Sequence, residues 1–218
     1  MAVLLVLATF LVFLVIDWAL NRKKATPVNT QQAAPRPTPL LSSASVEGIL
    51  VPDQLRYHPG HTWCLGERSQ LVRVGADALA ASVCGPVDQI ELPKIGRWLR
   101  QGQKGWSVVC GSERIDMLSP VEGEVVEVNP EVVNNPELLT KDPYGKGWLV
   151  RVTVPDRQSM DRNLLPHSLV RTWMKEAVRS VRARQGAVGN VMVAGGRTLT
   201  VTVDAQARPA LLKDVFLT

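Results

Sequence analysis

The sequence is poor in the side chains that bind metals or build disulfide frameworks. Its 218 residues include only three cysteines and three histidines. An odd, sparse set of cysteines does not make a disulfide framework, and no Cys-x-x-Cys pair is present. The histidines are not spaced as metal ligands on one helix face. We therefore expect no metal site and no disulfide framework. The residues concerned are Cys64, Cys84, Cys110, His58, His61 and His167.

Net charge is weak evidence for any class of partner. The formal charge is +5 and the sequence pI is about 9.4, which mildly favours acidic surfaces such as anionic lipid or nucleic acid. No interleaved aromatic and basic motif for RNA is present, so we expect no nucleic-acid partner.

The first 21 residues predict a single transmembrane anchor. Residues 2–16 are apolar apart from Thr9, and the whole segment approaches the roughly 20 residues that span a bilayer. A cleaved signal peptide is the alternative, but the sequence has neither a basic region before the apolar run nor a small-residue cleavage site after it. Because the flanking basic residues follow the segment, the positive-inside rule predicts a single-pass protein whose soluble part is cytoplasmic.

Three further segments follow the predicted anchor. Residues 22–48 contain four prolines among Thr, Gln, Ala and Ser, which predicts a disordered linker. Residues 49–156 show many short strands separated by Gly and Pro turns, which favours a mainly β domain. Residues 157–218 are expected to form an extension made of an amphipathic helix and a β-hairpin.

The extension has two predicted elements. Residues 164–185 place apolar side chains at helical spacing, and the basic side chains run along another face. That basic face fits either a solvated surface or a surface lying on an anionic membrane leaflet. Residues 190–203 contain Gly195-Gly196 and predict the hairpin. The apolar set is Leu165, Leu169, Trp173, Ala177 and Val181, and the basic set is Arg171, Lys175, Arg179 and Arg182.

The centre of the domain predicts a β-hairpin with a polar tip. Two β-branched runs flank Gly111 and Ser112, and Ser119-Pro120 begins the next turn. Together with residues 121–129, this stretch resembles the lipoyl-bearing hairpin of the glycine cleavage system H-protein family. Residues 134–148, which include Asp-Pro-Tyr-Gly-x-Gly-Trp, and the trio Tyr57, His61 and Trp63 resemble the same family.

The resemblance covers about residues 50–154 and implies a flattened β-barrel, or a sandwich of two small sheets, with short helices. It also implies a non-catalytic carrier that bears lipoate on a lysine. Aligned on Asp116 and Ser119-Pro120, the lysine position falls on Ser112, and no lysine lies between Lys104 and Lys141. A stable lipoyl amide needs a primary amine, which serine lacks. The preceding residues also depart from the family's usual Glu-Ser-Val.

We therefore expect no catalytic residues and no cofactor. The expected function is that of a binding or scaffold subunit, and the tip residues Gly111, Ser112, Glu113 and Arg114 are candidate contacts for a protein partner. That partner is a membrane complex or components of the glycine cleavage system. The alternative is a genuine lipoyl carrier that shuttles the aminomethyl group, with Lys104 as the nearby amine. Cys110 is a candidate reactive thiol, although the apolar run before it favours burial. Ser112 has no histidine base nearby in the sequence, which argues against a hydrolytic triad.

Two local features complete the expectations for the domain. Asp77 is predicted to cap a short helix over residues 78–82. His61, between a turn and a strand, is expected to be a structural hydrogen-bonding residue and not a catalytic one.

Overall fold

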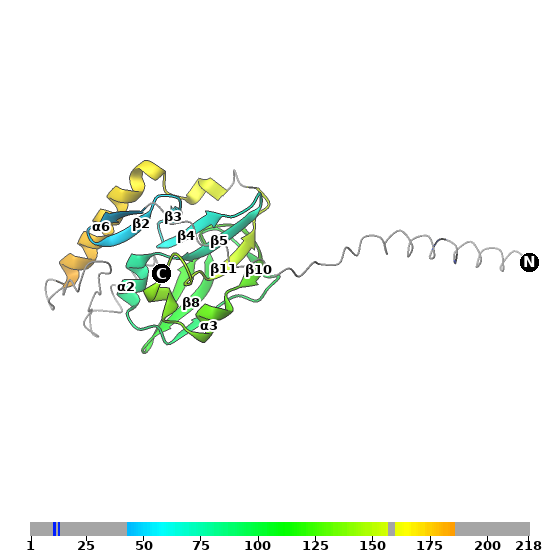
Figure 1. Cartoon of the computed structure of the whole chain (residues 1–218), viewed down its shortest axis with the longest axis horizontal. Helices are drawn as coiled ribbons and strands as arrows, with labels where there is room; N and C mark the ends of the chain where they lie inside the picture. Colours follow the sequence, from blue (N-terminus) through cyan, green and yellow to red (C-terminus); the bar gives the residue numbers. More distant parts are fainter. Residues whose placement is uncertain (1–10, 12, 14–42, 157–159, 186–218) are drawn as a thin grey trace, which may run out of the picture. The chain divides into compact units, whose positions relative to one another are not determined.

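The computed structural model describes Leu11, Phe13, residues 43–156 and residues 160–185 (Figure 1). The predicted anchor (residues 1–21) apart from Leu11 and Phe13, most of the predicted linker and the predicted hairpin of residues 190–203 lie outside the described residues. Within the residues that are described, no helix is both long and apolar enough to cross a membrane. Contacts divide the chain after residue 38, and the fold below belongs to residues 39–218.

The domain is mainly β, as predicted, and its strands form a curled half-barrel with short helices around it (Figure 1). The largest sheet has six strands in the order β3-β4-β5-β11-β10-β7, and all its pairs are antiparallel. Its strands are β3 (Arg56–His58), β4 (Thr62–Gly66), β5 (Leu71–Ala76), β7 (Trp98–Leu99), β10 (Gly123–Val128) and β11 (Val150–Thr153).

A three-stranded sheet carries the central hairpin. Its order is β6-β8-β9, with β8 in the middle. Its strands are β6 (Gln89–Glu91), β8 (Lys104–Cys110) and β9 (Glu113–Leu118). The hairpin predicted from the two β-branched runs is thus confirmed as β8 and β9.

A third sheet corrects the predicted linker. β1 (Ser43–Val46) pairs with β2 (Ile49–Pro52) through a turn at Glu47 and Gly48. Ile49 and Val51 of β2 are buried in the core. The linker predicted over residues 22–48 is therefore too long at its C-terminal end, because residues 43–46 pair with a strand whose alternate side chains are buried.

The helices are short except for the last one. They are α2 (Ala78–Cys84), α3 (Pro130–Asn134), α4 (Leu138–Lys141), the 3₁₀ turn η1 (Asp161–Asn163) and α6 (His167–Gln185). Asp77 caps α2, since its carboxylate accepts a hydrogen bond from the Ala80 amide at 2.8 Å. This confirms the predicted cap.

Helix α6 is present where the amphipathic helix was predicted, but its buried stripe differs. The residues that enter the core are Val170, Met174, Val178 and Val181, while Leu169 is 52% exposed. The predicted stripe was therefore wrong at Leu169, because the packed face is turned by about one residue. Trp173 lies at the margin of that face and is half-buried.

Much of the predicted basic face of α6 is engaged within the domain. Arg171 pairs with Asp53 at 3.0 Å, and Arg182 pairs with the Glu47 carboxylate at 2.8 Å. Arg182 also donates to the Glu47 carbonyl oxygen, and Arg179 lies 4.0 Å from the same carboxylate. These contacts tie α6 to the first hairpin and compensate part of its positive charge.

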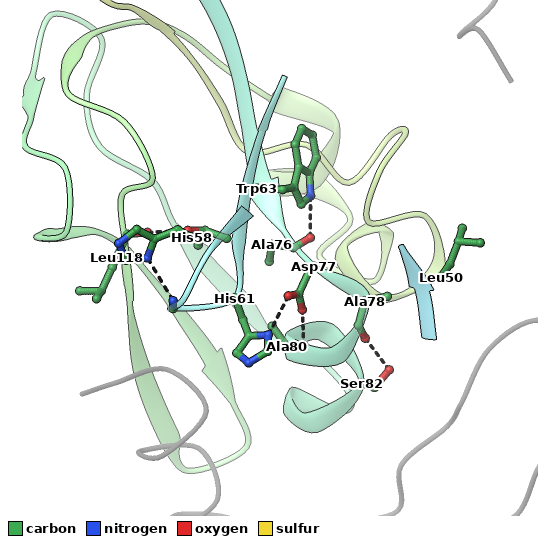
Figure 2. Close-up of polar contacts among 12 residues, drawn as sticks. Leu50, His58, His61, Trp63, Ala76, Asp77, Ala78, Ala80, Ser82 and Leu118 are labelled. Carbon is green, nitrogen blue, oxygen red and sulfur yellow. Dashed lines mark hydrogen bonds and ion pairs between the residues drawn. The ribbon is translucent and has the colours of Figure 1, made fainter. Parts of the chain in front are cut away.

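The two histidines near the first strands have local structural contacts. His61 Nδ1 lies 2.7 Å from Asp77 Oδ2 (Figure 2). The His61 ring also stacks on Trp173, with the ring centroids 4.5 Å apart. His58 Nδ1 accepts a hydrogen bond from the Gly60 amide, and burial lowers the pKa of His58. Both side chains are buried. These contacts agree with the structural role expected for His61.

Trp63 shows why one strand position must be glycine. Its indole Nε1 donates to the Ala76 carbonyl oxygen at 2.7 Å (Figure 2), and the side chain is fully buried. A Cβ atom on Gly75 would approach the Trp63 ring to 2.5 Å. The close contact of this ring with the β5 backbone therefore depends on Gly75.

Candidate functional site: the β8–β9 hairpin

A two-residue turn forms the tip of the hairpin. The register pairs Cys110 with Glu113, which leaves Gly111 and Ser112 as the turn. Gly111 has φ +66°, while Ser112 keeps an ordinary negative φ. A positive φ at the first central position alone is the pattern of a type II′ turn, which prefers glycine there. The sequence therefore favours a tight turn in which Ser112 is the second central residue.

The tip is exposed, and a side chain from a neighbouring segment holds it. The Gly111 amide donates to Asp88 Oδ2 at 2.6 Å, and the Asp88 amide donates to the Val109 carbonyl oxygen at 2.9 Å. Both Gly111 and Ser112 are exposed. Within the described residues, the Ser112 hydroxyl makes no hydrogen bond, so it has no histidine base. Its geometry offers no activated nucleophile.

Charged side chains cross the outer face of the same sheet. Arg114 on β9 pairs with Glu91 on β6 at 2.5 Å, and Lys104 on β8 pairs with Asp116 on β9 at 2.7 Å. The Ser107 hydroxyl donates to Asp116 Oδ1 at 2.8 Å. These contacts link all three strands below the tip.

Asp116 is the best-connected carboxylate of this face. Desolvation by itself raises its pKa, but hydrogen bonds from Lys104 and Ser107 and the nearby charges of Lys104 and Arg114 outweigh that effect. The pKa of Asp116 is therefore held below its usual value. The ionised carboxylate organises the strand pair.

Lys104 is at the wrong end of the hairpin to replace a tip lysine. In the register it lies opposite Leu118, where β9 ends, and Cys110 is six positions further along β8. At about 3.3 Å per strand residue, that places it roughly 20 Å from the tip. Its ammonium group is also held by Asp116. The structure thus separates the candidate amine from the candidate site.

Cys110 is buried, as its position after an apolar run predicted. The residue is only 1% exposed and belongs to the hydrophobic core. Reactive thiols are partly exposed and sit in electropositive surroundings. The folded domain gives Cys110 no such exposure, although it lies only two residues from the exposed Ser112.

Sequence reasoning missed the residues that hold the tip from β6. Asp88 and Glu91 lie more than twenty residues before Gly111 and Arg114, the hairpin residues that they contact, and only the sheet order β6-β8-β9 brings them together. A three-residue strand after a Gly-Pro turn gives no sequence signal for this pairing. Across the described residues, no group of three or more His, Cys, Asp or Glu side chains could hold a metal ion.

Comparison with known proteins places this hairpin domain in a family. The model of the glycine cleavage H-protein family matches residues 55–177, more than half of the chain. The H protein of Magnetococcus marinus is 34% identical over 57% of this chain and 88% of its own length. That of Prochlorococcus marinus is 37% identical over 51% of this chain and 85% of its own. A crystal structure of the H protein from Mycobacterium marinum is 27% identical, covers 51% of this chain and 96% of its own, and has a TM-score of 0.45.

The fold and the hairpin thus define a domain of the lipoyl-carrier class. The chain belongs to the glycine cleavage H-protein family. H proteins are lipoyl carriers and not catalytic enzymes, and they interact with the other components of the glycine cleavage system.

Proposed function

We propose that this chain is a membrane-tethered member of the H-protein family that lacks lipoate and acts as a binding or scaffold subunit. The observation that carries this proposal is Ser112 at the exposed tip of the β8–β9 hairpin. The family resemblance puts the lipoyl lysine at this position. A hydroxyl group cannot form the stable amide that joins lipoate to an amine.

The surroundings of the tip support a binding role. A carrier arm needs a long, mobile side chain, whereas this tip ends in a short hydroxyl group. Asp88 holds the Gly111 amide, and Arg114 is tied to Glu91. The tip residues 111–114 therefore present a fixed polar contour, which suits contact with a protein partner. That partner is a membrane complex or a component of the glycine cleavage system.

The location of the protein is part of the same proposal. The apolar segment of residues 1–21, followed by Arg22, Lys23 and Lys24, supports a single-pass anchor with the domain on the cytoplasmic side. The proline-containing segment that follows, up to β1, would let the domain stand away from the bilayer.

The decisive experiment is the intact mass of the full chain purified from membranes of its own host. We expect the unmodified mass. A lipoyl-sized increment would overturn the proposal, and peptide mapping would then test whether Lys104 carries the group. Ser112→Lys is the matched variant, produced in the same host with lipoate supplied. If it gains the increment while the parent chain does not, the missing amine at residue 112 is the cause. If neither gains it, the altered residues before the tip also block attachment.

A further inference from the structure

The turn of residues 94–97 and the strand that follows it combine exposed apolar side chains with exposed basic ones. Residues 94–97 form a β-turn closed by a hydrogen bond from the Arg97 amide to the Lys94 carbonyl oxygen, at 3.1 Å. Gly96 has φ +85°, as the third position of a type II turn requires. Ile95 therefore occupies the corner of the turn, where it is 63% exposed.

The turn is fixed to the sheet and continues into an edge strand. The Gly96 amide donates to the Val125 carbonyl oxygen at 2.7 Å, and the Val125 amide donates to the Arg97 carbonyl oxygen at 2.9 Å. β7 follows at once and is the edge of the six-stranded sheet. Trp98 on β7 is 49% exposed, and Val126, next to Val125 at the bulge of β10, is 39% exposed. Three large apolar side chains thus lie at one edge.

Positive charge surrounds these apolar side chains. Lys94, Arg97 and Arg100 are all exposed. Among the residues that the structure describes, none of the three is in an ion pair. Three basic side chains of α6 are compensated instead, because a carboxylate lies within 4.0 Å of Arg171, Arg179 and Arg182. The uncompensated cations of the domain therefore include a cluster beside Trp98 and Ile95.

We infer that this edge, defined by Lys94, Ile95, Arg97, Trp98, Arg100 and Val126, is a contact surface for anionic lipid. Tryptophan prefers the headgroup level of a bilayer, and basic side chains are attracted to anionic lipids beside it. An apolar residue at the corner of a rigid turn can enter the interface without unfolding the backbone. The inference extends the proposed membrane tether, but it rests on a different part of the chain.

Two acidic residues lie close to this surface. Glu122 accepts a hydrogen bond from the Trp98 indole at 3.3 Å, and Glu124 lies opposite Trp98 in the β7–β10 register. They reduce the net charge of the edge without cancelling it. We therefore expect binding that is weak for the isolated domain and that falls as salt is added. Tethering would make such weak binding effective by keeping the domain near the bilayer.

The test uses residues 39–218, which contain the described fold without the predicted anchor. The matched H proteins consist almost entirely of this domain, which supports its folding without residues 1–38. Sedimentation with phosphatidylcholine vesicles is compared with sedimentation with vesicles containing about one third phosphatidylglycerol. We expect binding to the anionic vesicles only, and less binding at high salt.

A matched pair of variants locates the contact. In the first, Lys94, Arg97 and Arg100 are all changed to Gln. One Lys or Arg at an anionic surface adds about 1 kcal/mol, which is roughly five-fold, so this variant should bind up to about a hundred-fold more weakly. In the second, Arg171, Lys175 and Arg179 of α6 are changed to Gln. It loses the same charge but should bind nearly as well as the parent.

Three outcomes would overturn the inference. They are absence of binding to anionic vesicles, equal losses in the two triple variants, or a loss confined to the α6 variant. Absence of binding would favour a protein partner for this edge, and a loss confined to α6 would assign the lipid contact to that helix. Trp98→Ala gives a further check, because it should weaken binding without changing charge. None of these results bears on lipoylation, which the intact mass tests separately.

Discussion

The carboxylate of Asp88 accepts a hydrogen bond from the Gly111 amide, 2.6 Å away, and so holds the tip of the β8–β9 hairpin from the residue that directly precedes β6. The donor is the residue immediately before Ser112. The turn therefore has a fixed orientation relative to β6, and this carboxylate, together with the Arg114–Glu91 ion pair, fixes the proposed contact surface of residues 111–114.

Asp88→Ala should release the tip without unfolding the domain. We expect hydrogen exchange at the Gly111 amide to speed up by about ten-fold, while the free energy of unfolding falls by only about 1 kcal/mol, as for one exposed hydrogen bond. Gln89→Ala, at the next exposed position, is the control and should leave Gly111 exchange unchanged. Equal exchange in all three proteins would show that Asp88 does not hold the tip.

Asp77 contacts both the first turn of α2 and the side chain of His61. Its Oδ1 accepts a hydrogen bond from the Ala80 amide and so caps α2, and its Oδ2 lies 2.7 Å from His61 Nδ1 (Figure 2). The His61 ring in turn stacks on Trp173 of α6. Asp77→Ala removes both contacts from a fully buried site and should lower the free energy of unfolding by about 3–5 kcal/mol. Urea denaturation measures this.

Asp77→Asn separates the two roles of that side chain. Its amide oxygen can still accept the hydrogen bond from the Ala80 amide, but the negative charge beside His61 is lost. We expect a loss smaller than that of Asp77→Ala. If the two variants were equally unstable, the charge facing His61 would matter more than the cap. If neither lost stability, the proposed coupling through Asp77 would be wrong.

Much of this fold could be predicted from local sequence. The two β-branched runs around Gly111 specified the hairpin, and Asp77 before an alanine-rich stretch specified the α2 cap. Both signals are short in range, because a turn or a cap is set by residues that are neighbours in the chain. The family motifs added the class of fold.

The errors arose where distant segments meet. β1 lies in a stretch with linker-like composition and is a strand only because β2 is available to pair with it. Leu169 fits a helical stripe, but the surface that α6 packs against selects Val170, Met174 and Val178 instead. Similarly, Asp88 and Glu91 reach the hairpin only through sheet order. Sequence spacing within one element does not contain this information.

The network around Asp116 predicts an acid-sensitive hairpin. The folded-state pKa of Asp116 is below the unfolded value of about 4, so the stabilising contribution of the ionised carboxylate is present above that pH. The contribution is lost as the pH falls through the lower, folded value. Asp116→Asn should therefore be less stable than the parent at neutral pH, and the difference should shrink in acid. Thermal unfolding from neutral pH down to about pH 3 tests this, and a constant difference would contradict it.

The three cysteines provide a test of the buried side of the hairpin. Cys64, Cys84 and Cys110 are all buried and form no disulfide, and burial raises the pKa of Cys64 to about 12. A thiol must be deprotonated and accessible to react. We expect a thiol reagent at pH 8 to label the native domain only as fast as it opens, and to label all three cysteines rapidly in urea. Mass spectrometry of digested samples gives the rate at each site.

Cys110→Ser is the control variant. Because serine is close to cysteine in size, we expect Cys64 and Cys84 to be labelled as slowly in this variant as in the parent. Rapid labelling of Cys110 alone in the native domain would instead show that the hairpin tip opens locally, and it would restore Cys110 as a candidate reactive thiol beside Ser112.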